Sequence, residues 1–284
     1  MTILGIYRER VFSPGKILAD AAILDATLLE LSRKGYESYT LQSEAIELYS
    51  ALPDCVLGMA QSEKTLGILE DWHKHGTVII NSVRSIRNCY RKSLINLLHG
   101  AGLPIPKSRS VPITALDPDK IIFRTSGGYW LKRGDVHAMQ SDDVVNVTST
   151  EGLVTALGHF RDRRVKDIVI QEHVEGQVIK FYGVGPGDFF GAFSVSTGEK
   201  MAHTETNCSF PIKQLDLIVK KAAEATGLTV YGGDAILSPQ GTFVLIDFND
   251  WPSFSPCCQH AAGSIATYIS RMIDGGFYEL SNSC

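Results

Sequence analysis

Two acids and an amide interrupt apolar segments near the C-terminal end of the sequence. Asp234 lies inside residues 230–237, and Asp247 and Asn249 lie at the end of a second apolar segment that begins at residue 242. The residues Ser-Pro-Gln-Gly between the segments are typical of a turn, so the pattern predicts an antiparallel hairpin. The i, i+2 spacing of Asp247 and Asn249 places both side chains on one face of the strand.

Carboxylates on buried strands need a positive charge beside them, because burial of an unpaired charge is costly. Carboxylate and amide oxygens without a nearby His or Cys suit Mg²⁺, which usually keeps waters and substrate phosphates among its ligands. The alternative is a pair of acids at strand ends, solvated or paired with lysine. Asp-x-Asn is a short pattern, so both interpretations stay open at this point.

The composition is that of an ordinary globular protein. The 284 residues carry a formal net charge of -4, with acids and bases interspersed, so we expect small charged metabolites as partners and neither nucleic acid nor a membrane surface. The six cysteines lack metal-ligand spacing, which favours reduced thiols. No segment has the pattern of a signal peptide or a membrane span. We therefore expect a cytoplasmic protein of about two domains, and a homo-oligomer is compatible with the sequence.

Strands and helices alternate in the first 80 residues. Strands are expected at residues 2–7, 36–41, 55–59 and 77–80, with helices at 18–34 and 62–75 and a helix-like segment from residue 43. This alternation predicts a doubly wound parallel sheet. Such sheets bind ligands at the carboxyl ends of their strands, so the loop with Arg8, Arg10 and Ser13 is a candidate site. A plain polar connector is the alternative for this loop.

A second unit begins near Asn81. A long helix is expected over residues 81–100, and the prolines of the LPIPK segment that follows it require extended chain. The further elements expected are strands at residues 121–123, 129–132, 144–147, 168–171, 178–184 and 189–195, and helices at 151–160, 211–226 and 260–273. We therefore expect one domain over residues 1–81 and another over residues 82–284.

From Asn81 to Ser253 the order of motifs resembles the ATP-grasp superfamily. NSVRSIRNCYRKSLINLLHGAGLPIPKS resembles the family's helix with a lysine, here Lys92 with Arg91 beside it as an alternative, and the exit from that helix. WLKRGD resembles the strand that carries a second lysine, here Lys132. VIQEHVEGQVIKFYGVG resembles the segment that joins the two halves of the grasp, and AAEATGLTVYGGDAIL with VLIDFNDWPS resembles the metal-binding strands.

The resemblance implies an α/β (α+β) ATP-grasp fold that holds ATP and Mg²⁺. Subdomains of about residues 105–173 and 174–284 would grip the nucleotide. The residues implied at the phosphates are Lys92, Lys132 and Lys180, those at adenine and ribose are Gln171, Glu172, His173, Val174 and Glu175, and those at the metal are Asp234, Asp247 and Asn249. Lysines that balance the triphosphate and acids that hold the metal are what this chemistry requires, and catalysis would rest on positioning and electrostatics.

Two departures from the family pattern bear on the reaction. The segment KRGDVHAMQSDD has one glycine where many members have a glycine-rich loop, and His137 within it would donate to a phosphoryl oxygen, with Lys180 as the other candidate catalytic group. Asp247 stands where carboxylate-amine ligases of the family commonly have Glu. An Asp-x-Asn ending and an H-x-M loop also occur in the family's inositol phosphate kinases.

The function implied first is an ATP- and Mg²⁺-dependent ligase similar to the RimK and glutathione synthetase branch. It would join a small-molecule carboxylate to an amine through an acyl phosphate. The alternatives are a phosphotransferase that resembles the inositol phosphate kinases and a nucleotide-binding regulatory protein without turnover. The candidate contacts to the acceptor are Arg8, Arg10, Ser13, Asn207 and Ser253.

Overall fold

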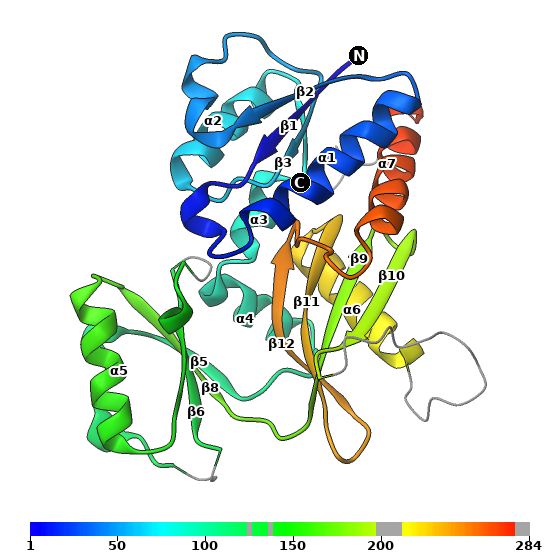
Figure 1. The fold of residues 1–284 in the computed structure, drawn as a ribbon. Helices are drawn as coiled ribbons and strands as arrows, with labels where there is room; N and C mark the ends of the chain where they lie inside the picture. Colours follow the sequence, from blue (N-terminus) through cyan, green and yellow to red (C-terminus); the bar gives the residue numbers. More distant parts are fainter. Residues whose placement is uncertain (124–126, 136–138, 197–211, 276–284) are drawn as a thin grey trace.

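Three four-stranded sheets organise the chain (Figure 1). The computed structural model describes residues 1–123, 127–135, 139–196 and 212–275. The strand orders of the three sheets are β2-β1-β3-β4, β5-β8-β6-β7 and β10-β9-β11-β12. In Figure 1 the first sheet lies above the other two, which stand side by side below it.

The first sheet is parallel, as the alternation of strands and helices predicted. Its strands are β1 (Thr2–Tyr7), β2 (Glu37–Gln42), β3 (Cys55–Gly58) and β4 (Val78–Ile80), and its helices are α1 (Ile17–Arg33) and α2 (Glu63–Lys74). Ile3 packs in the cluster of α1, whereas the next residue, Leu4, packs in that of α2. Helices therefore cover both faces, which explains why β1, β3 and β4 are largely apolar, whereas the edge strand β2 is polar and exposed.

The single helix expected over residues 81–100 is wrong. The chain forms two helices, α3 (Val83–Asn88) and α4 (Arg91–Gly100). Tyr90, between them, has an extended ψ of 127°, and its hydroxyl donates to Gln61 O at 2.9 Å and to Glu63 Oε1 at 3.0 Å. These partners lie far away in the sequence, so helical spacing alone could not reveal the break. The helix-like segment expected from residue 43 is confirmed and is a 3₁₀ helix, Ser43–Leu48.

The second sheet is antiparallel and carries α5 (Thr150–Asp162) on one face. Its strands are β5 (Ser108–Pro112), β6 (Tyr129–Arg133), β7 (Val144–Val147) and β8 (Asp167–Glu172). The prediction of a strand at residues 121–123 is wrong. Two 3₁₀ turns, Ile113–Ala115 and Pro118–Lys120, precede it and place Ile113 and Leu116 in the α5 core, so the chain reaches residue 123 without pairing.

The third sheet contains the predicted hairpin. Its strands are β9 (Gln177–Val184), β10 (Phe189–Ser194), β11 (Val230–Leu237) and β12 (Phe243–Asp250), and β11 and β12 pair in antiparallel register. One face packs on α6 (Ile212–Thr226) and α4, and Phe181 and Phe248 belong to one apolar cluster with Leu215 and Leu94. The hairpin is thereby held by a core of its own.

The C-terminal helix α7 (Cys258–Asp274) returns to the first sheet and packs along α1 (Figure 1). Ile265 and Ile269 of α7 share a buried cluster with Ile3 of β1 and with Val230 of β11. The first and third sheets are therefore joined through one core. This arrangement fixes the loop after β1 relative to the ends of β11 and β12.

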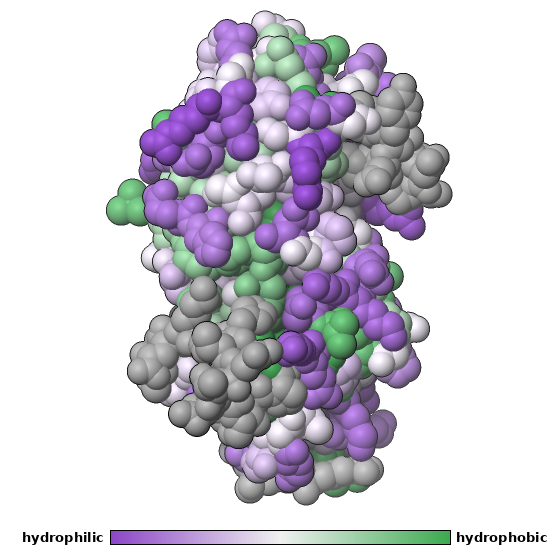
Figure 2. Space-filling view, turned by 90° about the vertical axis from the view of Figure 1, so that its right-hand side faces the viewer, coloured by the Kyte–Doolittle hydropathy of each residue, from purple (hydrophilic) through white to green (hydrophobic). Residues whose placement is uncertain are grey.

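The surface view shows mainly hydrophilic side chains with smaller apolar patches between them (Figure 2). Within the described ranges, no helix is both long and apolar enough to cross a membrane. Cys55, Cys89 and Cys258, which lie in these ranges, are free thiols.

Candidate active site

Three neighbouring strands of the third sheet bring acids and a lysine into one row. Asp234 on β11 is the register partner of Lys180 on β9 and of Asp247 on β12. Asn249 lies two residues beyond Asp247 and so shares its face. The opposite face, with Phe181, packs on α4 and α6. The sheet therefore presents its polar side chains away from its own core.

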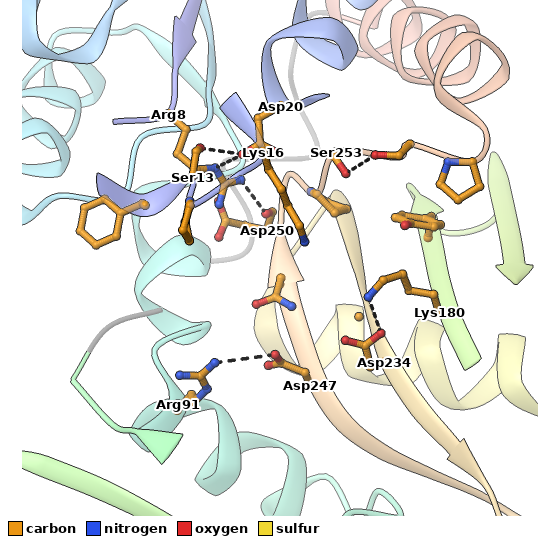
Figure 3. Close-up of a pocket in the computed structure, with 18 residues that line it drawn as sticks. Arg8, Ser13, Lys16, Asp20, Arg91, Lys180, Asp234, Asp247, Asp250 and Ser253 are labelled. Atoms are coloured by element: carbon orange, nitrogen blue, oxygen red, sulfur yellow. Dashed lines mark hydrogen bonds and ion pairs between the residues drawn. The ribbon is translucent and has the colours of Figure 1, made fainter. Parts of the chain in front are cut away.

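Each acid of this row lies beside a cation (Figure 3). Lys180 Nζ donates to Asp234 Oδ1 at 2.7 Å. Arg91 Nη2, at the start of α4, lies 3.9 Å from Asp247 Oδ2. The two carboxylates, which are both partly buried, therefore lie in a positive environment, as expected.

This row forms the floor of a cavity of about 450 Å³, within the range of small-molecule sites. The other walls come from the loop after β1 and from the loop between β12 and α7. The charged residues that line it are Arg8, Lys16, Asp20, Arg91, Lys180, Asp234, Asp247 and Asp250. Parts of the chain more than 200 residues apart thus meet in one space.

Arg91 enters the cavity, whereas Lys92 does not line it. The Arg91 side chain is 7% exposed, and Nη1 donates to Arg133 O at 3.2 Å. Its buried Nε has no hydrogen-bond partner among the described residues, which suits a donor aimed at a ligand. Lys92 is 54% exposed and pairs with Asp167 at 3.3 Å. Of the two candidates that the sequence left open, Arg91 is therefore the one that lines the cavity.

Lys132 of β6 links the second sheet to the third. Its Nζ donates to Ile246 O of β12 at 2.7 Å. Burial lowers the pKa of Lys132 to about 8, an effect that the nearby Asp247 opposes and Arg91 reinforces. An anion beside this ammonium would favour its charged form.

The residues predicted to bind the nucleotide begin at the end of β8, where successive side chains point to opposite faces of the second sheet. Gln171 is buried and shares a face with its register partner Trp130 and with Lys132. Its Nε2 donates to Ser108 Oγ at 3.2 Å. Glu172 lines a separate cavity of about 370 Å³ on the other face. Gln171 is thus placed toward the third sheet, and Glu172 away from it.

Trp130 is a residue of this region that the sequence analysis did not select. Its Nε1 donates to His173 Nδ1 at 3.1 Å, and the two rings stack at 6.3 Å. Because Nδ1 accepts, the neutral His173 ring carries its proton on Nε2, which lies 3.3 Å from Glu175. Val174 is half-buried between them. The i, i+2 spacing of Trp130 and Lys132 was the signal that could have identified it.

Arg8 and Ser13, two of the predicted acceptor contacts in the loop after β1, bind other residues of the protein. Arg8 Nη2 donates to Trp251 O at 2.6 Å and to Asp250 O at 3.3 Å. Asp20 accepts from Ser13 Oγ at 2.7 Å and lies 3.6 Å from Arg8 Nε. Arg8 and Ser13 line the cavity, but these contacts show that they also shape it.

Of the other predicted site residues, one lines the cavity and one lies outside it. Ser253 lines the cavity and shares a hydrogen bond of 2.8 Å with Ser255. Arg10 is exposed and does not line it. His137 and Asn207 lie outside the described residues.

The loop between β12 and α7 is fixed by buried aromatic residues. Trp251 and Phe254 are fully buried and adopt left-handed φ values of 35° and 50°. Trp251 Nε1 donates to Ile80 O at 3.0 Å. Gly232 makes room for the loop, because a Cβ there would lie 2.7 Å from Pro252 Cγ. Strained backbone of this kind is typical of functional loops.

Asp234, Asp247 and Asn249 offer three hard oxygen donors on one face of the sheet. In the part of the chain that the structure describes, no three His, Cys, Asp or Glu side chains gather as a metal site. A cation held here needs further oxygens from water or phosphate, which is the coordination that Mg²⁺ prefers. The donor set therefore fits Mg²⁺ and does not fit a zinc centre.

No family model and no curated protein matches the chain. Solved structures do resemble it. D-alanyl-alanine synthetase A from Vibrio cholerae has a TM-score of 0.75 and 10% identity, covering 97% of this chain and 98% of that one. D-alanine-D-alanine ligase from Bacillus anthracis complexed with ATP has a TM-score of 0.70 and 13% identity, covering 95% of each chain. A RimK domain ATP-grasp protein from Sphaerobacter thermophilus has a TM-score of 0.69 and 17% identity, covering 94% of this chain and 99% of that one. The chain therefore has the ATP-grasp fold that its motifs predicted.

Proposed function

We propose that the chain is an ATP- and Mg²⁺-dependent carboxylate-amine ligase. One observation carries this proposal: the row of Lys180, Asp234 and Asp247 and the loop after β1 line the same cavity. The cavity thus contains oxygen ligands for a metal ion that would bind phosphate. It also has a separate wall against which an acceptor substrate would lie. That two of the similar structures are named as ligases or synthetases supports this reaction class.

ATP would lie between the second and third sheets, where Lys132 already spans the gap to β12. The base would lie near Trp130 and Gln171, which share the inner face of the second sheet. The phosphates would then meet Lys132 and Arg91. Charge-assisted bonds from these buried cations are the strong kind of hydrogen bond to phosphate.

Mg²⁺ would be held by Asp234, Asp247 and Asn249 and would neutralise charge on the phosphates when bound. Without ligands, Lys180 pairs with Asp234 and Arg91 lies near Asp247, and both would face the phosphates of bound ATP. These two cations hold positive charge where the transferring phosphoryl group would lie. Their contribution to catalysis is orientation and electrostatic stabilisation.

In this reaction a substrate carboxylate oxygen attacks the γ-phosphorus, the bond to the bridging oxygen breaks, and ADP leaves. The resulting acyl phosphate is attacked at its carbonyl carbon by the amine, which loses a proton as inorganic phosphate departs. Rigid walls that exclude water would protect the acyl phosphate from hydrolysis. The fixed loop around Trp251 and Phe254 supplies such a wall.

A phosphotransferase is the second candidate, favoured by the Asp247-x-Asn249 ending of β12. It would use the same nucleotide and metal residues and would transfer the γ-phosphoryl group to a hydroxyl. The two reactions differ in the fate of the phosphate.

The test starts with a screen of ADP release against amino acids, small carboxylates and inositol phosphates. With an active carboxylate labelled with ¹⁸O, a ligase passes label to inorganic phosphate in the presence of the amine. Asp247→Asn is the control that should give no labelled phosphate. A stable phosphorylated hydroxyl without release of phosphate would replace the ligase by the phosphotransferase.

A further inference from the structure

A second cavity, of about 370 Å³, lies on the face of the second sheet that carries α5. Its floor comes from three adjacent strands. The backbone N–H of Glu172 donates to Lys107 O at 2.9 Å, and Glu172 is also the register partner of Tyr129. Facing residues of antiparallel strands present their side chains on the same face of a sheet. Lys107, Glu172 and Tyr129 therefore form one row across the sheet.

A second row on this face places a cation beside an apolar residue. Arg109 lies two residues after Lys107, so its side chain points to the same face. Its register partner on β8 is Ile170, which is 4% exposed and belongs to the core under α5. Arg109 therefore stands beside apolar surface.

The segment before β6 supplies another wall. Lys120, Ile121 and Ile122 line the cavity, and the Tyr129 hydroxyl donates to Ile122 O at 2.8 Å. Ile121 packs against the α5 core, whereas the Ile122 side chain is 67% exposed. The cavity thus combines basic side chains with apolar surface that is open to a ligand.

Three basic side chains and one acidic side chain line this cavity. Lys120 pairs with Asp117 at 3.1 Å, and Glu172 stands opposite Lys107, where opposite charges attract. Arg109 has an apolar register partner instead. Among the residues that the structure describes, none forms a hydrogen bond or ion pair with its guanidinium. Arg109 therefore carries a positive charge that is available to an anion.

The edge of the sheet adds a backbone donor. β5 is an edge strand, and in an antiparallel pair hydrogen-bonded and non-hydrogen-bonded residue pairs alternate. Because Glu172 N bonds to Lys107 O, the next pair, Ser108 with Gln171, is not hydrogen-bonded, and the N–H of Ser108 points away from β8. Ser108 also lines the cavity. Its N–H thus offers a second donor next to Arg109.

We propose that this cavity is a second ligand site, which binds a small organic anion with an apolar group. The anionic group would lie between the Arg109 guanidinium and the N–H of Ser108, and the apolar group would cover Ile122. A guanidinium suits carboxylates and phosphates, because its planar fork of donors matches their oxygens. Covering an exposed isoleucine removes apolar surface from water. This site is independent of the proposed ligase reaction, because the two cavities share no lining residue.

Calorimetry tests the site while Mg²⁺ and a non-hydrolysable ATP analogue fill the nucleotide site. The probes are benzoate, phenyl phosphate, inorganic phosphate and benzyl alcohol. Benzoate or phenyl phosphate should bind about tenfold or more tightly than inorganic phosphate, because the ring removes apolar surface from water. Benzyl alcohol has no charge and should bind at least about tenfold more weakly than the better aromatic anion. The tighter of the two aromatic anions identifies the preferred group as carboxylate or phosphate.

Variants separate the charge from the apolar wall. Arg109→Met should weaken the better aromatic anion about ten- to a hundredfold by removing a charge-assisted contact. Arg109→Lys should recover only part of the affinity, because an ammonium lacks the planar fork. Ile122→Ser should weaken the aromatic anion and leave inorganic phosphate unchanged. Lys166→Met removes an exposed lysine just before the other end of β8 and should match the wild type.

The outcomes decide whether the site exists. Binding of an aromatic anion that depends on Arg109 and persists beside the ATP analogue would establish it. Equal affinity in wild type and Arg109→Met, equal binding of benzyl alcohol and the aromatic anions, or no binding by any probe would exclude it. Binding that disappears when the ATP analogue is present would assign the probe to the nucleotide site and would also exclude a second site.

Discussion

Lys180 and Asp234 are register partners on β9 and β11, and their side chains form an ion pair of 2.7 Å on the floor of the cavity. Lys180 is 39% exposed and Asp234 is 24% exposed, so water screens the pair and its net contribution to stability is at most about 1 kcal/mol. A divalent cation at Asp234 would compete with this ammonium. We therefore expect the lysine to oppose metal binding until phosphates provide it with another partner.

Lys180→Met should therefore change metal and nucleotide affinity in opposite directions. Mn²⁺, used in place of Mg²⁺, should bind the nucleotide-free variant up to about fivefold more tightly, because the competing ion pair is gone. MgATP should bind more weakly, because a phosphate contact is lost. Calorimetry measures both, and Lys220→Met, which breaks the ion pair of α6 with Asp216, is the matched control. Weaker binding of both ligands would show that the lysine does not compete with the metal.

Asp247→Asn should leave the fold intact and abolish Mg²⁺-dependent turnover. The amide is nearly isosteric with the carboxylate but lacks the charge that a divalent cation requires. Circular dichroism should give an unchanged spectrum, and metal-free nucleotide should keep most of its affinity. Turnover near that of the wild type would remove Asp247 from the metal site.

The hairpin and its polar face were predictable from the sequence, because the strand period of two and a turn are local features. Asp247 and Asn249 therefore share a face as predicted, and the hairpin register places Asp234 opposite Asp247. The pairing of Lys180 with Asp234 was not predictable from periodicity. It depends on the register between β9 and β11, which join segments more than 50 residues apart.

The break between α3 and α4 shows where local reasoning failed. Apolar residues keep helical spacing through Tyr90, so one helix was expected. Instead, Tyr90 has an extended backbone, and its hydroxyl bonds to Gln61 and Glu63. The second helix begins at the next residue, Arg91. Tertiary contacts thus decide which cation enters the cavity, and the sequence could offer Arg91 only as the alternative to Lys92.

Lys132→Met should weaken ATP more than adenosine. A charge-assisted contact to phosphate contributes roughly 1.5 to 3 kcal/mol, or about ten- to a hundredfold in affinity. Methionine keeps much of the buried stem and removes the ammonium, so the sheet should survive. Calorimetric titrations with ATP and with adenosine measure the difference. Equal weakening of both ligands would assign Lys132 a structural role through Ile246 O alone.

ATP affinity should also fall with rising pH. Burial lowers the pKa of Lys132 to about 8, so the ammonium is mostly charged at pH 7 and loses its proton as the pH passes 8. Phosphates favour the charged form, so binding takes up a proton above pH 8, and affinity should fall by at most about tenfold per pH unit between pH 8 and 9.5. Lys132→Met should flatten this profile, whereas Lys92→Met should keep it. An unchanged slope in Lys132→Met would assign the titration to another group.

Arg91 and Lys92 provide a test with adjacent residues of like charge. Arg91 is buried in the cavity beside Asp247, with a buried Nε that no described residue satisfies, whereas Lys92 is exposed and pairs with Asp167. Arg91→Met should therefore raise the KM for ATP about tenfold or more, since a buried guanidinium donates charge-assisted bonds to phosphate. Lys92→Met should change KM less than about threefold, since an exposed ion pair contributes little. Arg91→Lys should recover only part of the affinity, because an ammonium lacks the planar fork of donors. A larger loss in Lys92→Met than in Arg91→Met would mean that the exposed lysine, and not the buried arginine, reaches the phosphates when ATP is bound.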